Sequence, residues 1–389
     1  MTSTTRRLRI GFVSIKDALD VSSWSGIPYH VLMHLREHPV DIELFSPLDR
    51  RLKWLQAPQI IMAKLRRQRL VLNHVPMLLK SYARQIECQL RSRSVDVVLS
   101  VDSIPITYLQ CKQPVVFWND AVFHDMVDYY PGFFSSLSPA AVRRGKREEE
   151  RALQRCDIAV YSSNWAANRA RRLTDPTKVK IVPFGSCLIE NASEEEIICR
   201  ARAKRTDRPN ACELLFVGVE WDRKGGDLAI ETTRLLNEAG IKARLRAVGS
   251  RPPYAVPDYV ELLGRIPKST PGGLAQLSSL FRDSDVFILP TKAEASAIVF
   301  CEASSFGLPI VTYDTGGTVE YVKDGISGAC LPVTANAADF AAAIGVFLEP
   351  TRYECLSRGA HQQYRDRLNW KTSVTQLVSI LNQSTSGMA

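Results

Sequence analysis

Two carboxylates, Glu294 and Glu302, stand in a stretch that otherwise has the composition of a buried core, TKAEASAIVFCEASSFGLPIVTYD at 291–314. The run 297–306 predicts a helix, which places Glu302 one to two turns inside it and Glu294 in the loop before it. An ionised carboxylate that is buried without a partner costs several kcal/mol. The partner is either a cation or helix-end amides of the protein, or a ligand with two adjacent hydroxyls such as a ribose. The residues alone leave both readings open.

Two cations follow the strand predicted at 213–219, ELLFVGV, in the same half of the chain. Arg223 and Lys224 come directly before Gly225 and the predicted start of a helix at 225–239. A strand-to-helix turn with two cations is a place where a diphosphate would bind. The alternative is a solvated turn with chance charges, but the two glutamates in the same half favour the diphosphate.

Backbone amides offer a second place for phosphate oxygens. The amides of Ser296, Ala297 and Ile298 lie at the predicted start of the helix that carries Glu302, and helix N-termini attract anions. The small side chains there let a ligand approach the backbone. The strand predicted at 260–266 ends at Ile266, and the loop that follows is expected to touch the base of a nucleotide.

Strands and helices alternate along the whole chain, which predicts parallel sheets with crossover helices. The charged stretch 184–212 lacks a strand pattern and separates two such series, so we expect two doubly wound domains, 1–186 and 187–369. The expected strands of the first domain are 9–15, 41–47, 95–101, 114–120, 157–163 and 178–184. Those of the second are 213–219, 243–250, 260–266, 285–290 and 309–315. The expected helices are 27–37, 76–92, 138–155, 164–173, 225–239, 272–283, 297–306, 336–348 and 369–383.

Composition is that of a globular protein with 45% hydrophobic and 23% charged residues in 389 residues. No run of about eighteen apolar residues predicts a membrane span. The first residues read as a strand and not as a signal peptide, and the nine scattered cysteines indicate reduced thiols, so we expect a cytoplasmic protein.

The net charge of +9 comes partly from two basic clusters. The cluster at 64–70, KLRRQRL, is either a plain surface helix or an amphipathic helix near anionic lipid, which would give peripheral contact with the cytoplasmic membrane face. The mixed-sign cluster at 143–155 is expected to be a solvated helix face. Net charge alone does not favour a nucleic-acid partner.

Together these motifs resemble the retaining glycosyltransferase family 4, the glycosyl transferases group 1. Its signature is two glutamates separated by seven residues, which is the spacing of Glu294 and Glu302. Further similar segments are FVGVEWDRKGGDLAIE (216–231), GLPIVTYDTGGTVEYVKDGISGACLP (307–332), VYSSNWAANRARRL (160–173) and VKIVPFG (179–185). The resemblance implies the GT-B fold, two Rossmann-like domains that face each other across a cleft. It departs from many members at Val219, where they have an arginine, and at Ala295-Ser296-Ala297, where they are rich in glycine.

The resemblance also implies roles on the donor side, in domain 187–369. Glu302 would bind the ribose hydroxyls of a nucleotide diphosphate sugar, and Glu294 would contact hydroxyls of the transferred sugar. Arg223 and Lys224 would neutralise the diphosphate. The family typically uses neither a divalent metal nor another cofactor, and no Asp-x-Asp motif is present.

The acceptor side would be domain 1–186, with the C-terminal helix, 370–389, packed back onto it. Ser25 and Gly26 follow the first strand, where members of the family approach the diphosphate; an ordinary loop-to-helix turn is the alternative. His124, in the stretch FWNDAVFHDMVDYYPGF after another strand, is the candidate near the reacting centre. Asp120 is the second candidate. The alternative for His124 is an ordinary surface histidine without a functional role.

The implied activity is retaining transfer of a sugar to a hydroxyl of a glycan or lipid-linked acceptor, as in polysaccharide biosynthesis. No side chain stands out as a covalent nucleophile, so we expect front-face attack. The alternatives are a non-catalytic sugar-nucleotide-binding protein of the same fold, or a different enzyme such as a sugar-nucleotide epimerase or a phosphorylase.

Overall fold

The computed structural model describes residues 6–49, 74–134 and 137–386. Its contacts divide the chain into two units. The N-unit comprises residues 1–182 and 374–389, and the C-unit comprises residues 183–373. The boundaries between the units fall after residues 182 and 373, each four residues away from the boundaries expected after residues 186 and 369. The basic cluster 64–70 lies outside the described residues.

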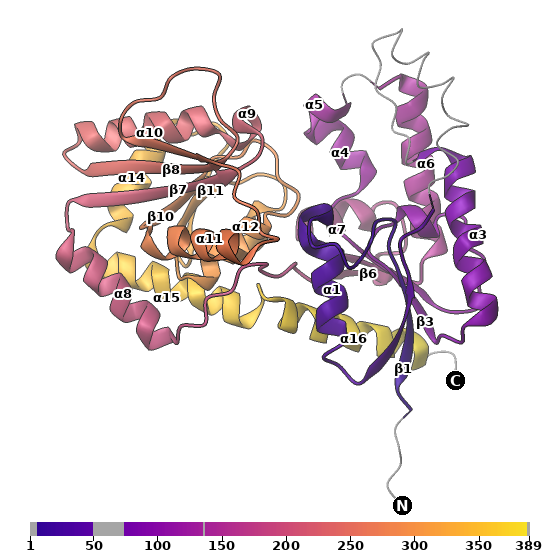
Figure 1. Ribbon diagram of the computed structural model, residues 1–389. Coiled ribbons are helices and arrows are strands. Elements are labelled where there is room, and N and C mark those ends of the chain that lie inside the picture. Colours follow the sequence, from indigo (N-terminus) through magenta and orange to yellow (C-terminus); the bar gives the residue numbers. More distant parts are fainter. Residues whose placement is uncertain (1–5, 50–73, 135–136, 387–389) are drawn as a thin grey trace, which may run out of the picture. The chain divides into compact units, whose positions relative to one another are not determined.

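The N-unit is built on six parallel strands in the order β2-β1-β3-β4-β5-β6 (Figure 1). The strands are β1 (Leu8–Val13), β2 (Val40–Phe45), β3 (Val97–Ser100), β4 (Val115–Asn119), β5 (Ile158–Tyr161) and β6 (Val179–Ile181). All residues of β3 are buried, as expected for a parallel sheet that helices cover on both faces. The order reverses between β1 and β3.

The helices of the N-unit are α1 (Ile27–Leu35), α3 (Pro76–Ser92), α4 (Phe123–Tyr129), α5 (Pro131–Phe134), α6 (Pro139–Arg155) and α7 (Asn164–Arg171). The last helix, α16 (Trp370–Ser386), begins in the C-unit and joins the N-unit from Val374. Capping residues fix where two of these helices begin. Ser138 accepts a hydrogen bond from the third amide of α6, and Ser163 accepts one from the third amide of α7. Pro139 is the first residue of α6.

The C-unit repeats this plan with the strand order β12-β11-β10-β7-β8-β9, all parallel (Figure 1). The strands are β7 (Ala211–Gly218), β8 (Lys242–Gly249), β9 (Val260–Gly264), β10 (Val286–Leu289), β11 (Ile310–Tyr313) and β12 (Gly328–Leu331). Strands β10 and β11 are buried along their whole length. The order reverses between β7 and β10.

The helices of the C-unit are α8 (Glu194–Asp207), α9 (Trp221–Lys224), α10 (Gly226–Glu238), α11 (Pro271–Asp283), α12 (Ile298–Ser305), α13 (Thr318–Tyr321), α14 (Ala337–Phe347) and α15 (Pro350–Asp366). Helix α15 packs against both α8 and α12. In the described part of the chain, no helix is long and apolar enough to cross a bilayer.

The structure corrects the sequence-based expectations at five places. The stretch 184–212 contains helix α8, β12 and α15 are additional elements, and the stretch expected to be a loop around His124 forms the helices α4 and α5. The mixed-sign helix α6 is not simply a solvated face, because Glu148 and Glu149 are buried.

Candidate active site

The strongest candidate site lies in the C-unit at the carboxyl ends of β7 and β10. These strands are neighbours and run parallel, so the loops after Gly218 and Leu289 leave the same edge of the sheet. The strand order reverses at this point, and ligands of doubly wound sheets bind in the crevice formed there. The first loop carries Arg223 and Lys224, and the second carries Glu294.

The structure brings these three charged side chains together. The ammonium of Lys224 donates a hydrogen bond to Oε2 of Glu294, and both side chains are buried. Nη1 of Arg223 lies 3.7 Å from the same oxygen, and Nε of Arg223 donates to Oε2 of Glu220 at 2.6 Å. One carboxylate oxygen is therefore held between two cations.

Gly225 makes this arrangement sterically possible. Its φ of +79° is in the left-handed region, and a Cβ atom at this position would lie 2.2 Å from the carbonyl oxygen of Pro290. The turn after β7 can therefore press against the end of β10. The amide of Lys292 donates to the carbonyl of Arg223 at 2.8 Å, and the amide of Gly317 donates to the carbonyl of Glu294 at 2.8 Å. These bonds join the loops after β7, β10 and β11.

Glu302 is completely buried in α12. Its Oε1 accepts a hydrogen bond from Nζ of Lys268, and its Oε2 has no hydrogen-bond partner among the described residues. Burial disfavours the charge on Lys268, but the adjacent Glu302 carboxylate, with smaller contributions from Cys187 and Cys301, raises the pKa of Lys268. A cation thus holds one oxygen of this carboxylate, and the other oxygen is buried without a hydrogen-bond partner among the described residues.

Lys268 is the site residue that the sequence analysis missed. It follows β9, whose carboxyl end lies at the same edge of the sheet as those of β7 and β10. The sequence did contain a signal for Lys268, because it is a basic residue shortly after a strand, as Arg223 is. Ile266, in the same loop, is half-buried and packs against the core of the C-unit.

The other predicted donor-side residues surround the start of α12. Ala297 is the N-cap and provides no side-chain hydrogen bond, and Ala297 and Ile298 are buried. The N-terminal amides of this helix are thus not capped by the side chain that precedes them. Ser296 is half-buried beside them. Val219, at the position where relatives often have arginine, is 58% exposed, whereas Arg223 reaches the carbonyl of Ala293.

In the N-unit, Ser25 and Gly26 follow β1 in an unusual backbone conformation. Three consecutive residues have positive φ angles: Trp24 at 44°, Ser25 at 56° and Gly26 at 81°. A residue other than glycine in this region costs ~1–3 kcal/mol, and such strain concentrates at functional sites. Asp20 accepts hydrogen bonds from Ser22 and Ser23, which lower the pKa of Asp20. This loop is more constrained than an ordinary loop-to-helix turn.

Asp120 and His124 follow β4 at the same edge of the N-unit sheet. Asp120 is half-buried, and its amide donates to Oδ1 of Asn119 at 2.8 Å. His124 lies in the first turn of α4, with Nε2 2.9 Å from Oε1 of Glu150 and with 12% of its side chain exposed. Burial lowers the pKa of His124, and Glu150 partly offsets this effect. His124 is therefore not a loose surface side chain.

Within the described residues, no three or more His, Cys, Asp or Glu side chains are grouped so that they could hold a metal ion.

Comparison with known proteins identifies the class. Residues 211–349 match the family described as "Glycosyl transferases group 1". Sucrose-phosphate synthase from Thermosynechococcus elongatus has a similar structure, with a TM-score of 0.66, 16% identity, and coverage of 98% of this chain and 100% of that chain. The Anabaena protein HepE, solved in complex with UDP-glucose, has a TM-score of 0.61 at 14% identity and covers 97% of this chain and 100% of its own. The fold is GT-B, as the sequence predicted.

A sequence relative supports the same class. The D-inositol 3-phosphate glycosyltransferase of Geodermatophilus obscurus is 28% identical over 262 residues, which are 62% of this chain and 56% of that protein. The chain thus matches little more than half the length of this relative. Within the C-unit, residues 211–349 thus resemble the glycosyl transferases group 1, the family that the paired glutamates and the other motifs predicted.

Proposed function

We propose that the chain transfers a sugar from a nucleotide diphosphate sugar to a hydroxyl of a glycan or lipid-linked acceptor, with retention of configuration and without a divalent metal. The observation that carries the proposal is Glu302, a fully buried carboxylate with one oxygen unpaired among the described residues. It shares a sheet edge with the cations Arg223 and Lys224. A ribose hydroxyl would satisfy the open oxygen, and the cations would meet the diphosphate.

The pairing of Lys224 with Glu294 supports a definite sequence of events on binding. Without ligand, Glu294 neutralises Lys224. A diphosphate competes with Glu294 for the ammonium of Lys224, because its two negative charges attract the ammonium more strongly than a single carboxylate does. Glu294 is then released to accept hydrogen bonds from hydroxyls of the transferred sugar. The same two residues thus serve the leaving group and the sugar.

In the transfer step, the bond between the anomeric carbon and the diphosphate oxygen breaks, and a bond to the acceptor oxygen forms on the same face. The proton of the acceptor hydroxyl moves to the departing diphosphate. Arg223 and Lys224 stabilise the charge that develops on the leaving group, which is the work that a metal ion does in other transferases. His124 or Asp120 would position the acceptor.

The test is a panel of UDP-, GDP- and ADP-sugars incubated with the chain and a lipid extract as acceptor source, with UDP-glucose first because HepE was solved with it. We expect one donor to release nucleotide diphosphate in step with sugar incorporation, unchanged in excess EDTA. Lys224→Ala should weaken the reaction. Arg234→Ala, which removes a cation paired with Glu231 and Glu238 on the surface of α10, is the matched control.

Three results would contradict the proposal. Binding of a sugar nucleotide without any turnover would indicate a non-catalytic protein. Conversion of the sugar nucleotide without an acceptor would indicate an epimerase. Loss of turnover in EDTA that Mg²⁺ or Mn²⁺ restores would refute the metal-independent assignment of Arg223 and Lys224.

A further inference from the structure

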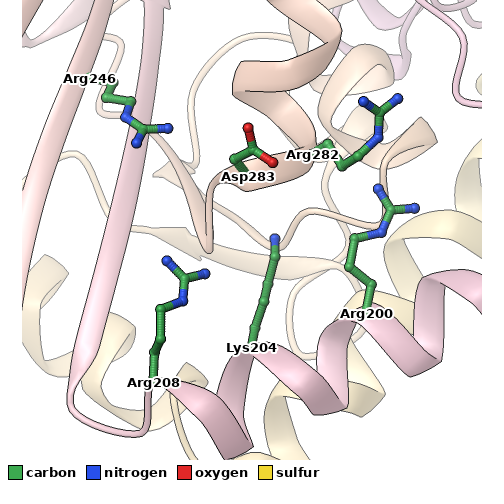
Figure 2. Close-up of a pocket in the computed structure, with 6 residues that line it drawn as sticks. All are labelled: Arg200, Lys204, Arg208, Arg246, Arg282 and Asp283. Carbon is green, nitrogen blue, oxygen red and sulfur yellow. The ribbon is translucent and has the colours of Figure 1, made fainter.

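A second group of cations lines a hollow of about 420 Å³ in the C-unit (Figure 2). Five basic side chains and one carboxylate form its walls. They are Arg200, Lys204, Arg208, Arg246, Arg282 and Asp283. The volume is in the range of small-molecule sites, and the lining is far from the apolar composition that such sites usually have.

Three elements build the hollow. Arg200 and Lys204 lie four residues apart in α8, and Arg208 follows by another four as its C-cap, so all three project from one face of the helix. Arg282 and Asp283 end α11, and Arg246 projects from β8. Figure 2 shows the ammonium of Lys204 directed between the two flanking sets of guanidinium groups.

The hollow is separate from the candidate active site. Arg208 comes shortly before the first residue of β7, and Asp283 shortly before the first residue of β10. The candidate active site lies beyond the other ends of these two strands. The eight residues of β7 span ~26 Å, so the lining residues of α8 and α11 lie at the opposite edge of the sheet from the candidate active site.

Arg246 is balanced by two carboxylates, because its Nε lies 3.4 Å from Glu213 and 3.6 Å from Glu261. Two further carboxylates beside the hollow are each shared between two cations. Oε2 of Glu190 accepts from Arg200 at 3.1 Å and from Arg282 at 2.9 Å. Oδ1 of Asp285 is 3.4 Å from Arg208, and it also holds the fully buried Arg205 at 2.8 Å. Each of these carboxylates therefore neutralises two guanidinium groups only in part.

Lys204 has the least compensation. Its ammonium donates to the backbone carbonyl of Ser284, which carries no net charge. Burial lowers the pKa of Lys204 to about 8; Asp285 opposes this shift, and the neighbouring arginines Arg200, Arg208 and Arg205 add to it. A phosphate would supply the missing charge, and guanidinium forks fit its oxygens in pairs.

We propose that this hollow binds a small, soluble anion with one or two phosphate groups, such as a phosphate ester or a diphosphate. Arg208 and Arg246 grip the phosphate from one side, Arg200 and Arg282 from the other, and Lys204 from below. This second site is independent of the proposed transfer of sugar, because the lining residues of α8 and α11 lie near the amino ends of β7 and β10, and Arg246 lies midway along β8.

Binding of pyrophosphate to the full chain, measured by calorimetry at low and moderate salt, tests the proposal. The background is Lys224→Ala, which removes the cation that would hold pyrophosphate at the candidate active site. In this background we expect saturable binding that weakens with salt. Adding Lys204→Gln and Arg208→Gln should weaken it about tenfold or more.

The two substitutions are chosen so that the fold survives. Lys204 gives up only a carbonyl partner, and Asp285 keeps Arg205 and the amide of Glu213 at 2.7 Å. The matched control is Arg202→Gln with Arg358→Gln, which removes two exposed cations paired with Glu354, one of them from α8 itself. This control should leave pyrophosphate binding unchanged. If the doubly substituted chain does not fold, Arg282→Gln alone gives the same comparison.

Two outcomes would overturn the proposal. Equal affinity of the pocket variant and the control would show that the hollow does not hold the anion. Binding to phosphatidylglycerol vesicles that depends on Lys204 and Arg208, with no binding of pyrophosphate or inorganic phosphate, would assign the hollow to a lipid headgroup and not to a soluble anion.

Discussion

A carboxylate such as Glu302 is expensive to keep inside a core helix with only one of its oxygens paired among the described residues. Glu302→Gln retains the shape of the side chain and loses its negative charge. If the open oxygen accepts ribose hydroxyls, the change removes charge-assisted hydrogen bonds worth ~1.5–3 kcal/mol. We expect nucleotide affinity to fall ~10- to 100-fold while the chain stays folded, as measured by calorimetry with UDP, GDP and ADP. Unchanged affinity for the nucleotide that binds would exclude the ribose role.

Lys224 and His124 should give different kinetic signatures. Lys224→Ala should weaken both nucleotide binding and transfer, since the ammonium meets the diphosphate before and during reaction. His124→Ala should leave nucleotide affinity nearly intact and lower kcat by ~10²–10⁴ if the imidazole acts at the reacting centre. Glu150→Gln, which removes the negative charge beside His124, should lower kcat less than His124→Ala does. Full transfer by His124→Ala would leave Asp120 as the residue to test.

Glu149 makes stability depend on pH. Burial raises the pKa of Glu149 to about 8, Asp102 adds to the rise, and Ser103 opposes it through a hydrogen bond at 3.1 Å. The folded state therefore retains a proton that the unfolded chain loses above its ordinary pKa of 4.5. The stabilisation is complete at low pH and is lost as the pH rises from about 4.5 to about 8.

Glu149→Gln should remove this dependence. The variant should be more stable than the parent at pH 8, by ~2–4 kcal/mol, and gain little at pH 5. Urea unfolding of the N-unit at pH 5, 6.5 and 8 measures the difference. Parallel stability curves for the two proteins would show that Glu149 is ionised in the folded chain.

The sequence selected charged residues that the structure brings together, but it did not predict their mutual contacts. Residue type and position after a strand selected Arg223, Lys224 and Glu294, and Glu302 was selected as a carboxylate in an otherwise apolar helix. The pairing of Lys224 with Glu294 could not be predicted, because it depends on which strands are neighbours. Strand order is set by packing of helices against the whole sheet, and a single sequence does not display it.

At the level of elements, the strands were predictable because parallel strands form continuous apolar runs, as in the VFIL of β10. Helix α8 was missed because its face toward the core is short and mixed, with Ile197, Ala201 and Arg205 buried among charged neighbours. Strand β12 begins with a glycine and has only four residues, so its pattern is weak. The pattern of α15, with Tyr353, Leu356 and Ala360 buried, was present in the sequence.

Helix α8 depends on its first turn, because its core face is small. Ser193 and Glu196 form a reciprocal capping box, with the Ser193 hydroxyl accepting from the Glu196 amide at 3.2 Å and the Glu196 carboxylate accepting from the Ser193 amide at 2.7 Å. Ser193→Ala should lower the free energy of unfolding of the C-unit by ~1 kcal/mol. Thr206→Ala, at an exposed position in the last turn, is the control and should change it by less than ~0.5 kcal/mol. If the two substitutions lower the stability of the C-unit equally in thermal unfolding, the capping box does not determine the stability of α8.

At the level of the whole molecule, we expect α16 to stabilise the N-unit, although most residues of that unit lie far from α16 in the sequence. Val374, Leu377 and Leu381 are completely buried, and the residues from Val374 onward belong to the N-unit. Removing residues 374–389 should destabilise the N-unit and leave nucleotide binding by the C-unit close to normal. Limited proteolysis followed by mass analysis would show which unit is cut first. Early cleavage in the C-unit would contradict this expectation.

The order of the two units along the chain has a consequence for synthesis on the ribosome. The C-unit, residues 183–373, is one continuous piece, whereas the N-unit lacks its last helix until the C-unit has been made. Domains usually fold in the order in which they emerge. Here the unit that is translated second can complete its fold first, while the nascent N-unit waits with the binding surface for α16 uncovered. A chaperone that shields apolar surface would therefore be needed longest by the part of the protein that is made earliest.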